Sequence, residues 1–354
     1  MRRLLFAGTE EEALEQLHKN GSTDGLPVIV PTPSRVDRMT LASGAEPDMV
    51  LGTMGPKNAV ATIEKVAVAA VMAGCLPDHM PVVLAAVKAV IDPVFDLTEM
   101  QATTHCTAPL IIVNGPARHS CGPLASGYGA LGPGHRANAS IGRALRLAMI
   151  NIGGGRPGSS DMALLGHPGK FTYCLGENEE DSPFDPLHVS LGYSAEDSVA
   201  TVLGAEGPHS VLFGADGDDP ESYKGLLDIL SIGLANPATN NAVLTGGSAL
   251  IILNPEHAKV LARAGLDRKT ISEEIFVRCS HAEKDLKHLV PAFSNKKSGK
   301  RNAFNEPEQI LIMMAGGSGL YSMAVPTWSA GANKNSPSSQ IIETDFFCEI
   351  PQSS

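Results

Sequence analysis

The sequence predicts an α/β fold with two lobes around short, largely parallel or mixed sheets and a glycine-rich cleft. Short apolar segments alternate with segments whose apolar residues recur at helical spacing. Several of these apolar segments run through proline directly into a helix, which is common in α/β proteins. With 354 residues the chain is long enough to form two lobes.

In the first half, the residues Thr9 to Glu12 form a capping box, which predicts a helix at residues 10–20. A short apolar strand is expected at 26–30, because Pro31 ends the run. Further on, proline and asparagine mark the starts of helices and glycine marks an end, and the turn Asn114-Gly115-Pro116 closes one apolar run. They predict helices at 33–39, 58–74, 81–91 and 138–151, and a strand at 110–113.

The second half repeats these patterns. Helices are expected at 222–234 and 255–264, and strands at 249–253 and 310–314. Residues 28–36 and 251–260 both pass from an apolar run through proline into a helix, which raises the hypothesis of a duplicated lobe. The alternative is that strand-proline-helix is a common local solution. We expect an N-terminal lobe over 1–205, a C-terminal α/β lobe over 206–329 and an extended tail over 330–354.

Composition limits the classes of function. The net charge of -11 argues against a nucleic-acid-binding surface, which needs a basic stripe. No apolar run approaches the roughly 20 residues that span a bilayer, and the N-terminal run is too short for a signal peptide, so no membrane association and a cytoplasmic location are expected. The 6 cysteines form no CxxC pair, which predicts free thiols.

Residues 103–180 are the expected functional site. Of the 36 glycines, ten lie between Gly122 and Gly158, and four histidines and three cysteines fall in the same segment. Glycine allows close approach of the backbone to a ligand. We expect residues 132–142, residues 153–160 and the end of a strand at 173–177 to line one cavity.

A loop that opens onto a helix N-terminus near Arg136 is typical of an anion site, because free N–H groups and the helix dipole favour a carboxylate. Arg136 can then bind the anion with two hydrogen bonds. The alternative is a glycine turn with a surface arginine. A second glycine-rich turn follows the strand at 310–314. The expected substrate-binding residues are Gly134, His135, Arg136, Asn138, Ser140, Gly317 and Ser318.

Acid/base and thiol chemistry have separate candidates. His105, His167 and Glu177 are the expected acid/base groups, and Cys75 and Cys106 are the expected thiols. The alternatives are a histidine bonded to a backbone carbonyl and a buried, inert cysteine. Adjacent strand residues point to opposite faces, so His105 and Cys106 form a dyad only if their segment is not a regular strand.

A catalytic metal is an alternative, although no cofactor is predicted. The four histidines match no short ligand motif, while Glu177 and Glu179 offer oxygen ligands.

Seven segments together resemble a widespread, poorly characterised bacterial family. They are DGLPVIVPTPSRV, MAGCLPDHMPVVLAA, QATTHCTAPLIIVNGP, LGPGHRANASIGRALR, LGHPGKFTYCLGENEE, NPEHAKVLARAG and MAGGSGLYS, and they span nearly the whole chain. The family is associated with UGSC-type (seleno)proteins, whose small members carry a Cys- or selenocysteine-Gly-Ser-Cys motif. The resemblance implies a small thiol or selenol protein as partner. Because this chain has no such tetrapeptide, the resemblance assigns it no redox role and no catalytic residue.

These observations predict an enzyme, a lyase, hydrolase or thiol-dependent transferase or oxidoreductase. It would act on a small carboxylate-bearing, anionic molecule in a glycine-lined cleft by thiol- or acid/base-assisted bond cleavage or transfer. One alternative is a metal-dependent hydrolase or hydratase with histidine and glutamate ligands. Another is a non-catalytic scaffold subunit in a complex with a small thiol or selenol protein. The polar tail favours a homo-oligomer in which it crosses to another subunit.

Overall fold

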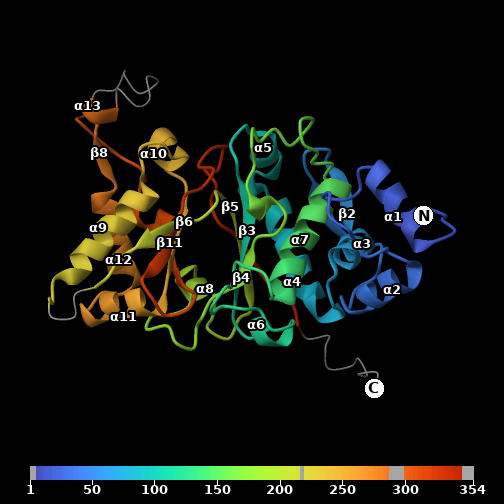
Figure 1. The fold of residues 1–354 in the computed structure, drawn as a ribbon, viewed down its shortest axis with the longest axis horizontal. Coiled ribbons are helices and arrows are strands. Elements are labelled where there is room, and N and C mark those ends of the chain that lie inside the picture. The colour runs from blue at the N-terminus through green and yellow to red at the C-terminus, as the bar shows by residue number, and fades with distance from the viewer. Residues whose placement is uncertain (1–4, 216–218, 287–298, 345–354) are drawn as a thin grey trace.

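The computed structural model describes residues 5–215, 219–286 and 299–344, and it has four layers (Figure 1). Two four-stranded sheets face each other in the middle, and helices cover the outer face of each. The α/β fold class predicted from the sequence is therefore confirmed. None of the described helices is both long and apolar enough to cross a membrane.

The first sheet has the strand order β12-β5-β3-β4. Only β3 and β4 are parallel; the other two neighbouring pairs are antiparallel. Helices α4 and α7 pack on its outer face, with α3 behind them. The bounds are β3 (Ala108–Asn114), β4 (Cys174–Gly176), β5 (Val199–Ala205), β12 (Ser338–Ile341), α3 (Ile63–Ala73), α4 (Met80–Ile91) and α7 (Arg136–Asn151).

Most other elements of the first half lie around these helices or the first sheet, whereas α8 contacts β10 of the second sheet. Helix α2 packs against α3, and β1 and β2 form an antiparallel hairpin against α4. The bounds are α1 (Glu10–Lys19), α2 (Pro33–Leu41), β1 (Val50–Met54), β2 (Ala59–Thr62), α5 (Leu97–Ala102), α6 (Ala117–Ser120) and α8 (Leu187–Ser190).

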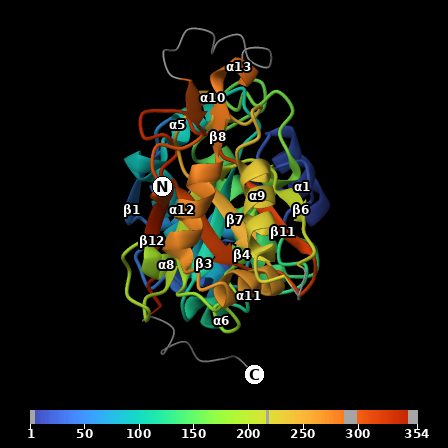
Figure 2. The same cartoon turned by 90° about the vertical axis from the view of Figure 1, so that its left-hand side faces the viewer.

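The second sheet has the order β10-β7-β11-β6, with β10 and β7 parallel. Figure 2 shows α9 and α12 in front of this sheet. The bounds are β6 (His209–Leu212), β7 (Ala249–Leu253), β10 (Ile310–Met314), β11 (Tyr321–Val325), α9 (Ser222–Leu234), α10 (Asn240–Leu244), α11 (Pro255–Arg263), α12 (Arg268–Arg278), β8 (Ser280–Ala282), α13 (Glu283–Leu286) and β9 (Lys300–Asn302).

The two sheets share one topology. In each, a parallel pair is connected through helices, the next strand along the chain lies antiparallel to the first, and a fourth strand closes the edge. In each sheet the fourth strand follows the third strand of the other sheet in the chain. After β5 of the first sheet the chain forms β6 of the second, and after β11 of the second sheet it forms β12 of the first. The topology matches β7 with β3, where residues 110–114 read LIIVN and residues 250–254 read LIILN. Residues 28–36, whose pattern raised the hypothesis of a duplicated lobe, contribute no strand to either sheet.

Apolar side chains between the sheets form a core that both halves share. Leu110, Ile112 and Leu203 of the first sheet belong to one buried cluster with Leu250 and Met313 of the second. All five are fully buried. Burial of apolar surface stabilises a protein by about 25 cal/mol per Å². Because this cluster is buried only when the two sheets pack together, it holds them in one relative position.

Most predicted helices form, but two local predictions were wrong. Residues 26–30 are not a strand; among the described residues their backbone finds no partner strand, and Ile29 N–H bonds only to the Met72 carbonyl of α3. The helix predicted from residue 58 begins at Ile63, because residues 59–62 pair with β1. Both sheets are mixed, with a single parallel pair in each.

Candidate functional site

A carboxylate–imidazole pair lies where the chain first crosses between the sheets. Glu206 directly follows β5, and His105 lies in a bend between α5 and β3. His105 Nε2 is 2.9 Å from Glu206 Oε1, and the two side chains are 20% and 27% exposed. The pair is thus accessible from solvent but largely shielded by the fold.

Asn240 fixes which nitrogen of His105 carries the proton. Asn240 Nδ2 lies 2.8 Å from the Trp328 carbonyl oxygen and 2.9 Å from His105 Nδ1. A carbonyl oxygen only accepts, so Asn240 presents its NH₂ group there and donates its second N–H to Nδ1. The proton of the neutral imidazole is therefore on Nε2, which donates to Glu206. Glu206 Oε2 receives no hydrogen bond from the residues that the structure describes.

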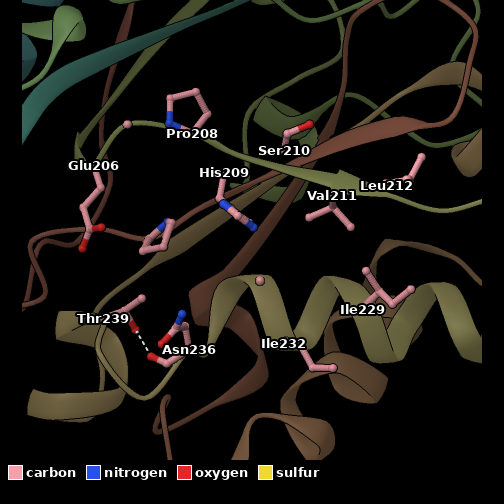
Figure 3. Close-up of a pocket in the computed structure, with 13 residues that line it drawn as sticks. Glu206, Pro208, His209, Ser210, Val211, Leu212, Ile229, Ile232, Asn236 and Thr239 are labelled. Atoms are coloured by element: carbon pink, nitrogen blue, oxygen red, sulfur yellow. Dashed lines mark hydrogen bonds between the residues drawn. The ribbon is translucent and has the colours of Figure 1, made fainter.

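Glu206 lines one end of a cavity of about 500 Å³. Strand β6 and helix α9 run along opposite sides of this cavity, with Glu206 near one end and Leu212 near the other (Figure 3). Polar lining residues include His209 and Thr239, and Ile229 and Ile232 supply an apolar wall. A small molecule in this cavity can therefore meet the carboxylate while it contacts apolar surface.

His167 lies beside the same corner. Its Nε2 is 3.2 Å from the Ala205 carbonyl, and Gly169 N–H donates to its Nδ1 at 3.2 Å. Burial lowers the pKa of His167, an effect that the Ala205 carbonyl partly opposes. A Cβ on Gly207, which lines the cavity, would come within 3.7 Å of the His167 ring. The two backbone contacts thus hold His167 in one orientation, and burial disfavours its charged form.

Cys106 is near this corner but does not form a hydrogen-bonded dyad with His105. Both His105 nitrogens are occupied by Glu206 and Asn240. The Cys106 sulfur instead accepts a hydrogen bond from Gly166 N–H at 3.2 Å. Of the cysteines in the described part of the chain, Cys106 alone is not buried.

The structure places Glu177 elsewhere, in a buried network between the two sheets. Its carboxylate is fully buried, pairs with Arg268 of α12, and accepts from Asn114 at 2.6 Å and from Leu187 N–H at 2.7 Å. Met314 N–H of β10 lies 3.4 Å away. Every oxygen of Glu177 is thus engaged, and the arrangement joins β3, β4, β10 and α12.

Cys75, Arg136 and Ser140 meet at the end of α3. The Arg136 guanidinium donates from Nε and Nη2 to the Gly74 carbonyl at 3.2 and 3.0 Å, and Ser140 donates to the same oxygen. Gly74 is left-handed with φ of 87° and ends the helix. Burial raises the pKa of Cys75, so this thiol stays protonated. The two bonds of Arg136 are thus used on the protein's own backbone.

Of the remaining expected binding residues, Gly317 and Ser318 contact the exposed side chain of Tyr128, and His135 contacts its backbone. The Tyr128 hydroxyl donates to the Ser318 carbonyl at 3.3 Å, and its ring packs on Gly317, where a Cβ would clash at 2.0 Å. His135 Nε2 lies 3.3 Å from the Tyr128 carbonyl. Asn138 bonds both backbone groups of Ala125. Gly134 precedes His135 with φ of 105°. The contacts of Tyr128 with Gly317 and Ser318 connect the first half of the chain to the second.

The glycine-rich segments do not line the cavity beside Glu206. A Cβ on Gly153 would lie 2.3 Å from the Gly55 carbonyl, and one on Gly155 would lie 2.0 Å from Gln101, so these glycines allow close packing. A second cavity of about 510 Å³ lies beside α11, and it too includes no residue of 132–142, 153–160 or 173–177. Within the described ranges, no three or more His, Cys, Asp or Glu side chains are grouped to hold a metal ion.

Sequence reasoning missed Glu206 and Asn240. Glu206 stands in the segment AEGPHS directly after an apolar run, a position where site carboxylates of α/β proteins often occur. That signal was available. No comparable signal marks Asn240, because its role depends on the Trp328 carbonyl 88 positions away.

Comparisons with protein-family models, curated proteins and solved structures give no match to this chain. The description of this protein therefore depends on its own fold and site. It is a four-layer α/β protein with a carboxylate–imidazole pair at the end of a cavity.

Proposed function

We propose that this chain is an enzyme in which Glu206 is the acid/base group for a small molecule bound between β6 and α9. The His105–Glu206 pair at the end of the cavity is the observation that carries this proposal. One carboxylate oxygen is held by the His105 Nε2–H, and the other is free to take a proton from a bound molecule. Positioned proton transfer of this kind contributes about 10²–10⁴-fold to a rate.

In this mechanism His105 is a positioning residue. Its Nε2–H donates to one oxygen of the Glu206 carboxylate, and Asn240 donates to Nδ1 and so fixes the orientation of the ring. Like charges repel, so a substrate carboxylate would bind away from Glu206. His209 and Ser210 line that part of the cavity, whereas Arg136 is bonded to Gly74.

Thiol-assisted chemistry is a second candidate, supported by the exposure of Cys106 and the Gly166 N–H directed at its sulfur. In the scaffold alternative, the chain would bind a small thiol or selenol protein and would itself convert no substrate.

The proposal is tested by incubating the full chain with a mixture of cell metabolites and following each compound by mass spectrometry. We expect at least one compound to be converted, and Glu206→Gln to slow that conversion at least 100-fold. Glu256→Gln is the matched control, because Glu256 lines the second cavity. Equal conversion by Glu206→Gln and the wild type would remove Glu206 from the mechanism. No conversion, with retained binding of a thiol protein, would favour the scaffold.

A further inference from the structure

Strand β6 has an open edge. It is the outermost strand of the second sheet and pairs only with β11, with Leu212 opposite Tyr321 and Val211 opposite Ser322. Phe213 N–H donates to the Leu320 carbonyl at 2.9 Å, so the backbone hydrogen-bonding groups of Phe213 face β11. Because antiparallel ladders alternate, Val211 faces β11 as well, and the backbone groups of Ser210 and Leu212 point outward. Neither of these residues has a backbone partner within the described part of the chain.

The cavity follows this edge. Its lining runs continuously from residue 206 to residue 212 on one side and takes Ile229 and Ile232 of α9 on the other (Figure 3). Gly233 lets α9 come close, because a Cβ there would lie 3.1 Å from Val211. Leu212 and Ile232 are 55% and 71% exposed. The result is a groove with hydrogen-bonding groups on one side and apolar surface on the other.

The charge of the groove indicates which chemical group a bound molecule would place beside Glu206. Glu206 is the one carboxylate among its lining residues, and these residues include no lysine or arginine. The free Glu206 Oε2 therefore favours an ammonium group. The four residues of β6 span about 13 Å at about 3.3 Å per residue, so a peptide of five extended residues covers the strand and reaches one residue into the turn before it.

We propose that the groove between β6 and α9 binds an extended peptide by strand addition, with an ammonium group of the peptide at Glu206. The peptide backbone pairs with Ser210 and Leu212, and alternate side chains contact Ile229 and Ile232, as in other cases of β-strand addition. This inference rests on the proposed function, because both use the site at Glu206. It names the substrate class as peptides that carry a primary amine.

The test uses the full chain labelled with ¹⁵N and a library of pentapeptides that have an N-terminal lysine and a C-terminal amide. We expect the amide signals of Ser210 and Leu212 to shift on titration. Peptides with an N-methyl group on every second amide are the matched controls: methylation in one register should weaken binding at least tenfold, and methylation in the other register should leave it nearly unchanged. Binding that is equal in both registers would overturn strand addition.

Leu212→Pro tests the protein side. Proline removes the outward N–H but leaves the bonds of the neighbouring residues to β11, which edge strands tolerate. Peptide affinity should fall at least tenfold while the melting temperature stays close to that of the wild type. If this variant does not fold, Ile232→Ser should weaken binding through loss of the apolar wall without adding a charge, because Ile232 is exposed.

Two outcomes separate the inference from the proposed function. Metabolite conversion that depends on Glu206, with no peptide shifting Ser210 or Leu212, would overturn the inference alone. Peptide binding at β6 with no conversion of any peptide or metabolite would support the inference and contradict the proposed function.

Discussion

His105 Nε2 lies 2.9 Å from Glu206 Oε1, although 101 positions separate the two residues. The register of the first sheet explains this contact. Strands β3 and β5 are antiparallel, with Ala108 opposite Ala205. The residues just before β3 and just after β5 therefore meet at one edge of the sheet. The pair thus follows from strand pairing and needs no local motif.

The tautomer of His105 is the first prediction. In ¹⁵N spectra of the wild type, we expect Nε2 to carry the proton of the His105 ring and Nδ1 to be the acceptor. Asn240→Asp should make the ring doubly protonated, because a carboxylate at this position accepts from Nδ1 instead of donating to it. Asn236→Asp is the control, since Asn236 lines the cavity but has no hydrogen bond to His105. A wild-type ring protonated on Nδ1 would contradict the hydrogen-bond assignment.

The second prediction concerns thiol reactivity. Iodoacetamide should modify Cys106 at least 100-fold faster than Cys75, because Cys106 is partly exposed and burial raises the pKa of the Cys75 thiol. Mass spectrometry of peptides from a time course gives both rates. Cys106→Ser should remove the fast reaction. Similar rates at the two positions would show that the α3 end opens readily in solution.

The third prediction concerns whether Arg136 binds a ligand or stabilises the fold. Arg136→Ala should lower the free energy of unfolding by about 1 kcal/mol, because two hydrogen bonds to the Gly74 carbonyl are lost. Ligand binding at Glu206 should not change. Urea denaturation measures the first effect, and Arg263→Ala at the exposed end of α11 is the control. A loss of ligand binding with unchanged stability would restore Arg136 as an anion-binding residue.

His79, which is buried directly before α4, predicts how the free energy of unfolding depends on pH. Burial lowers the pKa of His79 to about 4, from an unfolded value of about 6.5. Between these values the unfolded chain binds the extra proton and the folded chain does not, so stability should fall as the pH drops from 6.5 toward 4. His79→Gln should flatten this part of the profile, as measured by urea denaturation at each pH. A variant with the full wild-type slope would assign the effect to other groups, such as His167 and His257, whose pKa values burial also lowers.

Local signals in the sequence determined many elements, because caps and apolar spacing act within one turn or one strand. Gly74 ends α3 in the left-handed region, and the apolar run at 249–253 forms β7. Composition alone could not decide strand pairing. Residues 26–30 are apolar yet have no partner strand in the described structure, whereas β5 forms because β3 and β12 pair with its two edges.

The sequence by itself determined the α/β class and pointed to His105, Cys106 and His167 as chemically notable. Only the tertiary structure decided their surroundings, because each partner comes from a distant segment. Pairing of β3 with β5 brings Glu206 to His105, and the crossing to β6 extends the cavity along α9. Other long-range contacts pair Glu177 with Asn114 and Arg268, and Arg136 with the Gly74 carbonyl. Long-range backbone pairing and burial, rather than local composition, therefore set which reactive side chains face a cavity.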